Sequence, residues 1–160
     1  MQKRPRVVAV IGSKEATGEE ARLAEEVGRE LAAHRVVLVC GGLGGVMEAA
    51  CRGARSAGGL TIGILPGTSP DDANPHVTIA IASGVGYARN QAVVRSACAV
   101  IAVGGGYGTL TEIGYALDAG IPVVGLGTWQ VSHRGRPDPP IIPATTAAEA
   151  VGRALELAGP

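Results

Sequence analysis

Two glycine-rich turns are the features of this sequence most suited to binding a ligand. They read Gly41-Gly-Leu-Gly-Gly45 and Gly104-Gly-Gly-Tyr-Gly-Thr109. Glycine lets backbone N–H groups approach an anion closely, and a helix that starts at such a turn adds unpaired donors and a favourable dipole. Each turn therefore predicts a phosphate site, although tight turning and close helix–sheet packing would require the same glycines. Two such turns, together with an arginine at the start of a nearby helix, favour anion binding.

Two charged residues near these turns are the candidates for chemistry. Arg89 begins a predicted helix directly after a strand. Glu112 follows the second glycine turn, where a carboxylate could face a ribose or a developing sugar cation. The run Thr109-Leu-Thr-Glu112 also has the form of a capping box, in which Glu112 would only bind the backbone of Thr109. The sequence leaves both interpretations open.

The elements that must position these residues follow from an alternation of apolar runs and helical patterns. Continuous Val/Ile/Ala runs predict strands buried on both faces, and the amphipathic segments between them predict helices. The predicted strands are Arg6–Gly12, Val36–Gly41, Leu60–Pro66, Val77–Ser83, Ala99–Gly104 and Pro122–Gly127. The predicted helices are Gly18–His34, Gly45–Ala57, Tyr87–Cys98, Thr109–Ala119 and Ala147–Ala158, with loops at Gly67–Pro75 and Thr128–Thr146.

This order predicts a Rossmann-like, doubly wound α/β fold, in which helices flank a mainly parallel sheet of six or seven strands. We expect a single domain over residues 1–160, because no repeat or change of composition marks a second one. Ligands of such sheets bind at the carboxyl ends of the strands. The binding residues predicted at that edge are Ser13, Gly41, Gly42, Gly44, Gly45, Asn90, Gly105, Gly106, Tyr107, Gly108 and Thr109.

Composition excludes several classes of function. Fourteen basic residues balance fourteen acidic ones and aromatic residues make up 2% of the chain, which disfavours binding of nucleic acid or an anionic membrane. Three widely spaced cysteines, no signal-peptide core and no membrane span predict a cytoplasmic protein. His34, His76 and His133 lack partners at metal spacing, so we expect no metal. Neither GxGxxG nor GxxxxGK[ST] occurs, and we expect no cofactor.

The segment from Gly104 to Glu112 resembles the PGGxGTxxE signature of the Lonely Guy (LOG) family. These enzymes are cytokinin-activating nucleoside 5′-monophosphate phosphoribohydrolases, formerly labelled lysine decarboxylases. The turn that begins at Gly41 is similar to the family's GGGxxGLM motif, and Arg89 stands 23 residues before Glu112, as in the family. The resemblance implies a Rossmann-like homodimer or higher homo-oligomer. It also implies phosphate binding near Gly105–Thr109 and a catalytic pair, Arg89 and Glu112.

This resemblance implies hydrolysis of the N-glycosidic bond of AMP or a cytokinin riboside 5′-monophosphate, giving the free base and ribose 5-phosphate. Glu112 would stabilise the oxocarbenium-like ribose, while Arg89 would hold the substrate and assist departure of the base. A pyridoxal phosphate decarboxylase is excluded, because Lys3 and Lys14 are the chain's two lysines and neither suits a buried Schiff base.

Departures from the signature point to a second possibility. Gly104 stands in place of the proline, Asn90 in place of a lysine, and Glu48 in place of a glycine. This pattern is closer to a bacterial side branch that includes molybdenum cofactor carrier proteins, which bind without hydrolysing. The sequence favours a phosphoribohydrolase, because both Arg89 and Glu112 are retained, and the alternative is a non-catalytic carrier or nucleotide sensor. The loop around Trp129, the single tryptophan, is expected to cover the crevice, and quenching of its fluorescence by AMP would support this.

Overall fold

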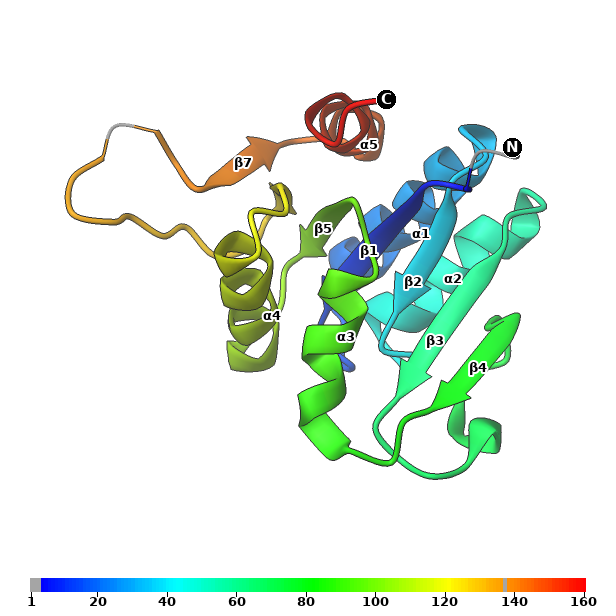
Figure 1. Cartoon of the computed structure of the whole chain (residues 1–160). Coiled ribbons are helices and arrows are strands. Elements are labelled where there is room, and N and C mark those ends of the chain that lie inside the picture. The colour runs from blue at the N-terminus through cyan, green and yellow to red at the C-terminus, as the bar shows by residue number, and fades with distance from the viewer. Residues whose placement is uncertain (1–3, 137) are drawn as a thin grey trace.

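The computed structural model describes residues 4–136 and 138–160, and its centre is one parallel sheet of seven strands (Figure 1). The strands lie in the order β4-β3-β2-β1-β5-β6-β7. Their bounds are β1 (Val7–Gly12), β2 (Val37–Cys40), β3 (Thr61–Leu65), β4 (Ile79–Ala82), β5 (Ala99–Val103), β6 (Val123–Leu126) and β7 (Ile141–Ala144). The direction of winding reverses between β1 and β5, which places the ligand crevice of such folds beside the end of β1.

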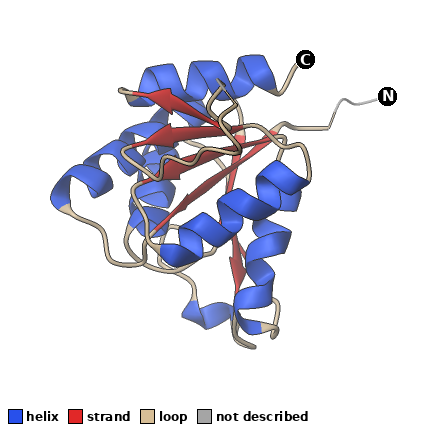
Figure 2. Cartoon of the chain, turned by 90° about the vertical axis from the view of Figure 1, so that its left-hand side faces the viewer, coloured by secondary structure: helices blue, strands red, loops and turns tan. Residues whose placement is uncertain are grey.

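Helices cover both faces of the sheet (Figure 2). The core on one face joins β1, β2 and β5 to α1 (Gly18–Ala33), α2 (Val46–Ser56) and α5 (Ala147–Leu157). The core on the other face contains side chains of α3 (Arg89–Arg95) and α4 (Tyr107–Asp118). Short 3-10 turns form η1 (Pro70–Asp72) and η2 (Gly86–Ala88). The predicted doubly wound, Rossmann-like parallel fold is therefore confirmed.

Close packing of α1 on α2 shows how this sequence supports the sheet. Thr17 and Glu20 form a capping box at the start of α1. Further along the same helix, Val27 and Leu31 are fully buried. A Cβ at Gly28 would collide with the main chain of α2, and one at Gly53 would collide with the main chain of α1. These glycines let the two helices approach closely and rest together on the strands.

The seventh strand is an element that the sequence analysis assigned to a loop. Strand β7 lies inside the segment predicted as the loop Thr128–Thr146 and pairs with β6, with Ile141 opposite Val123. It has four residues, one of which is Pro143, and it lies at the edge of the sheet. A proline is tolerated on an edge strand, where its missing N–H breaks no ladder, but it removes the usual sequence signal of a strand.

Two helix boundaries also differ from prediction. Helix α3 runs from Arg89 to Arg95, inside the predicted span Tyr87–Cys98, because residues 86–88 form the 3-10 turn η2. Helix α4 begins at Tyr107, two residues before the predicted start at Thr109. Glycine serves as its N-cap residue, so no Ser, Thr, Asp or Asn marks the true start. Both helices still begin at the carboxyl edge of the sheet, as the site requires.

Candidate functional site

Arg89 and Asn90 open helix α3 and are almost completely enclosed, with 5% and 7% of their surfaces exposed. Arg89 Nε and Asn90 Oδ1 are buried polar atoms without a hydrogen-bond partner among the residues that the structure describes. Such groups are rare in folded proteins and cost free energy unless a ligand or water satisfies them. Burial also lowers the pKa of Arg89, against the opposing charge of Glu112. Arg89 and Asn90 are therefore placed to bind a group that the polypeptide itself does not supply.

The first glycine of the 41–45 turn makes room for Arg89. A Cβ at Gly41 would lie 2.9 Å from Arg89 Nη2 and 3.2 Å from Cζ, which is closer than real Cβ contacts allow without a shift. The guanidinium thus rests against the main chain at the end of β2. A larger residue at position 41 would displace it from the carboxyl edge of the sheet.

Glu112 lies on α4 close enough to interact with Arg89, but the two do not form a contact ion pair. Within residues 4–136 and 138–160, no N–O distance of 4.0 Å or less joins them. Glu112 is 7% exposed, and desolvation raises its pKa to about 8 although the positive charge of Arg89 opposes the shift. At neutral pH the free protein therefore holds Glu112 mainly as a neutral acid opposite an arginine.

The capping-box interpretation of Glu112 is wrong. The N-cap residue of α4 is Gly106, no side chain caps the helix, and Thr109 already lies within its first turn. Thr109 is buried, with its hydroxyl packed against Gly105. Glu112 is consequently one turn beyond the capping positions, and a helix cap does not account for a buried carboxyl group there.

The 104–109 turn has an open helix start. Leu110 N donates to Gly106 O, but the N–H groups of the first turn receive no side-chain cap. The turn is held from outside, since Thr128 Oγ1 donates to Gly104 O at 2.5 Å and Trp129 Nε1 donates to Gly106 O at 3.0 Å. The free N–H groups of the first turn of α4, together with the helix dipole, form an arrangement that attracts anions.

Gly104 departs from the LOG signature for a structural reason. Its φ is +53°, whereas proline is restricted to about −65°. In addition, the carboxyl group of Glu20 occupies the place where a Cβ on Gly104 would lie. The backbone of this turn therefore takes a course that the signature's proline does not allow.

The 41–45 turn is closed by the protein itself. Val46 N, at the start of α2, donates to Ser13 O at 2.9 Å. Gly42 O accepts from Asn74 N, also at 2.9 Å, and a Cβ on Gly45 would collide with the main chain of Ser13 and Lys14. These contacts match the alternative in which the glycines serve packing. A phosphate role for Ser13, Gly42, Gly44 and Gly45 stays a prediction.

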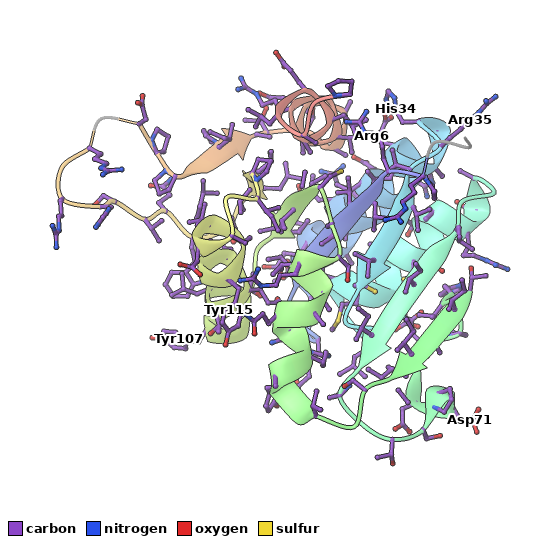
Figure 3. The ribbon with its side chains drawn as sticks, in the orientation of Figure 1. Arg6, His34, Arg35, Asp71, Tyr107 and Tyr115 are labelled. Carbon is purple, nitrogen blue, oxygen red and sulfur yellow. The ribbon has the colours of Figure 1, made fainter. Side chains whose placement is uncertain are left out.

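The remaining candidates fall outside this edge or have different surroundings. His34 and Arg35 lie near Arg6, at the opposite end of the molecule from Tyr107 (Figure 3). Cys40 and Cys51 are buried, and their sulfurs lie 3.5 Å apart, a pairing that no sequence spacing indicated. Within the described ranges 4–136 and 138–160, no group of three or more His, Cys, Asp or Glu residues could hold a metal ion.

The described part of the chain also has no helix that is both long and apolar enough to cross a membrane.

Two solved structures resemble the whole fold. One is the molybdenum cofactor binding protein of Rippkaea orientalis, with TM-score 0.85, 34% identity and coverage of 95% of this chain and 96% of that one. The other is the Moco carrier protein of Chlamydomonas reinhardtii, with TM-score 0.83, 34% identity and coverage of 96% and 98%.

The chain also resembles two known proteins in sequence. An uncharacterized protein of Archaeoglobus fulgidus is 48% identical over 119 residues, 74% of this chain and 78% of that protein. A probable cytokinin riboside 5′-monophosphate phosphoribohydrolase of Oryza sativa subsp. japonica is 37% identical over 93 residues, 56% of this chain and 41% of that protein. The model of the SLOG cluster4 family matches residues 5–153. The chain therefore belongs to the SLOG cluster4 family, a LOG-like family near the molybdenum cofactor carriers.

Proposed function

We propose that this protein binds a phosphorylated heteroaromatic molecule of the molybdopterin type and carries it without cleaving it. The observation that carries the proposal is the pair of buried, unpartnered atoms Arg89 Nε and Asn90 Oδ1, on a helix that starts at the same sheet edge as the uncapped α4. A phosphate at the start of α4 would accept from the N–H groups of Gly108 and Thr109. Arg89 would supply the positive charge.

The burial of Arg89 and Glu112 favours carriage over cleavage. Arg89 and Glu112 are 5% and 7% exposed, so a ribose reaches Glu112 only after this region opens. A phosphate needs less access, because the first residues of α4, Tyr107 and Gly108, are exposed. The likeness to two molybdenum cofactor binding proteins, each over at least 95% of this chain, supports the same ligand class.

A second candidate, a nucleoside 5′-monophosphate phosphoribohydrolase, is favoured by one specific observation. Glu112 is not a helix cap, and a buried carboxyl group with a pKa of about 8 opposite an arginine is typical of a functional site. In that reaction Glu112 would stabilise the oxocarbenium-like ribose once ionised, and Arg89 would assist departure of the base. The 37% identity to the rice phosphoribohydrolase covers 56% of this chain and supports the candidate less broadly.

Metal-free incubation with AMP and a panel of other nucleoside 5′-monophosphates distinguishes the two functions. Chromatography follows release of free base, and calorimetry measures binding of the same nucleotides and of molybdopterin. We expect molybdopterin to bind and no base to be released. Base release that Glu112→Gln abolishes would overturn the carrier proposal and establish the hydrolase.

The proposed homo-oligomer is tested on the same protein. Light scattering coupled to gel filtration should give a mass of at least twice the 16.0 kDa of the chain. A mass of one chain at micromolar concentration would remove the oligomer from the proposal.

A further inference from the structure

A cavity of about 560 Å³ lies beside the start of α4 but outside the Arg89–Glu112 pair. It is lined by residues of β6 and β7 and by residues 127–132 and 139 between these strands. Its volume falls within the range of small-molecule pockets. The side chains that shape it include Thr128, Trp129, Val131, Ser132, Ile141 and Pro143.

The cavity lies on the same side of the sheet as Arg89 and Glu112. Ile141 belongs to the core that contains side chains of α3 and α4, and Trp129 and Val131 pack against that core. Strand β7 pairs with β6 so that Ile141 lies opposite Val123 and Pro143 lies opposite Gly125. Alternate residues of a strand point to the same face of a sheet, so these positions all lie on this face. The absence of a side chain at Gly125 lets Thr128 pack over β6, since a Cβ on Gly125 would lie 2.6 Å from Thr128 Cγ2. A ligand can therefore approach both places from one face of the molecule.

Trp129 joins the cavity to the glycine turn. Its ring lines the cavity, its Nε1 donates to Gly106 O at 3.0 Å, and its centroid lies 5.5 Å from that of Tyr107 at an interplanar angle of 41°. Tyr107 is 80% exposed and points outward from the first turn of α4 (Figure 3). The indole thus stands between the anion-attracting helix start and the cavity.

The chemistry of the lining selects a flat, uncharged group. Of the described residues, none with an acidic or basic side chain lines the cavity. Its walls are an indole, aliphatic side chains and prolines, and Gln130, Ser132 and Thr128 contribute amide and hydroxyl groups. Such surroundings suit an aromatic ring whose edge carries hydrogen-bonding groups. Fused bicyclic heterocycles such as purines and pterins have this character.

We propose that the cavity holds the heterocyclic ring of the ligand, against Trp129, while the ligand's phosphate lies at the start of α4. This inference rests on the proposed function, because it assumes a phosphorylated heteroaromatic ligand. It adds a ring-binding site to the phosphate site and assigns Trp129, which lines the cavity and donates to Gly106 O, as the residue that contacts the ring. Ligand specificity then resides in residues 128–132, 139, 141 and 143, which line the cavity.

The test compares ligands with and without a ring. Trp129, the single tryptophan, reports on the cavity by fluorescence, and calorimetry gives the affinities of AMP, neopterin phosphate and ribose 5-phosphate. We expect at least one of the two ring-bearing phosphates to change the fluorescence and to bind at least tenfold more tightly than ribose 5-phosphate. Equal affinities and unchanged fluorescence would overturn the ring site. Loss of all binding, ribose 5-phosphate included, would overturn the phosphate site of the proposed function and this inference with it.

A filling substitution separates the cavity from the phosphate site. Ser132→Phe places a ring in the cavity from an exposed position, and the matched control His133→Phe adds the same ring at a neighbour that does not line it. We expect Ser132→Phe to weaken the ring-bearing ligand at least tenfold, to leave ribose 5-phosphate within twofold, and His133→Phe to change neither. Unaltered affinity of the ring-bearing ligand in Ser132→Phe would overturn the proposal.

Discussion

The two glycine-rich turns have similar compositions and opposite structural situations. In the 41–45 turn the start of α2 is occupied by Ser13 O, and Gly41 and Gly45 sit against neighbouring atoms. In the 104–109 turn the start of α4 has no side-chain cap, and a Cβ on Gly106 would meet nothing within 4 Å. Neither helix has a side-chain cap, and the difference is that Val46 N, the first N–H of α2, donates to the protein, whereas among the described residues the N–H groups of Tyr107, Gly108 and Thr109 do not. Glycine content alone therefore does not identify a phosphate site.

The largest effect should come from adding one methyl group to each turn. Gly45 has φ +62°, and a Cβ there would collide with the main chain of Ser13 and Lys14, so Gly45→Ala should lower the free energy of unfolding by about 4 kcal/mol. Gly106 has φ −101° and open space, so Gly106→Ala should cost less than about 1 kcal/mol. Urea denaturation measures both. Equal losses would remove the distinction between the turns.

The second effect concerns the carboxyl group of Glu112, which is buried on α4 and does not cap the helix. Its carboxyl group has a usual pKa of 4.5 and a folded-state pKa of about 8. Below pH 4.5 both states hold the proton. As pH rises towards 8 the unfolded chain releases the proton and the folded protein keeps it, so the free energy of unfolding falls. Linkage gives a loss of about 3 kcal/mol between pH 5 and pH 8.

Urea denaturation at several pH values checks this loss, with Glu112→Gln as the matched variant. The glutamine does not ionise, so the difference in unfolding free energy between wild type and variant should change with pH while the variant alone stays nearly flat. Parallel pH profiles would mean that Glu112 is solvated in the folded protein. They would also remove the electrostatic argument for a functional carboxyl group.

The third effect comes from adding a capping side chain to the free start of α4. Gly106→Asp places a carboxylate at the N-cap position of α4, where it accepts from the free N–H groups and interacts favourably with the helix dipole. The cap and the helix dipole together should raise stability by about 1 kcal/mol, and the affinity for ribose 5-phosphate should fall at least tenfold. Calorimetry with Gly106→Ala as control measures the affinity. Full binding in Gly106→Asp would place the phosphate elsewhere.

Much of the fold, but less of the site, could be predicted from the sequence. Continuous apolar runs marked six of the seven strands, because central parallel strands are buried on both faces. Strand β7 was missed because its four residues include Pro143. The edge where Arg89 and the glycine turns meet followed from the fold. The start of α4 did not, because Gly106 and Tyr107 carry no capping signal whereas Thr109 and Glu112 imitate one.

The contrast between the turns lay beyond sequence reasoning, since it depends on contacts between distant segments. Ser13 O reaches Val46 N only because β1 and β2 are neighbours in the sheet. The 3.5 Å separation of the Cys40 and Cys51 sulfurs likewise arises from packing of α2 on β2. Spacing along the chain indicates which residues share an edge, whereas packing decides which of their polar groups remain free.

The smallest effect concerns what keeps the open turn in shape. Trp129→Phe retains an aromatic ring beside Tyr107 but removes the Nε1 donor to Gly106 O, so stability should fall by about 0.5–1 kcal/mol. Circular dichroism during urea denaturation measures this, because the variant has no tryptophan. Ribose 5-phosphate should bind nearly as before, since its donors belong to α4. A large loss of that binding would instead show that the 104–109 turn is held open by Trp129 rather than by its own glycine backbone.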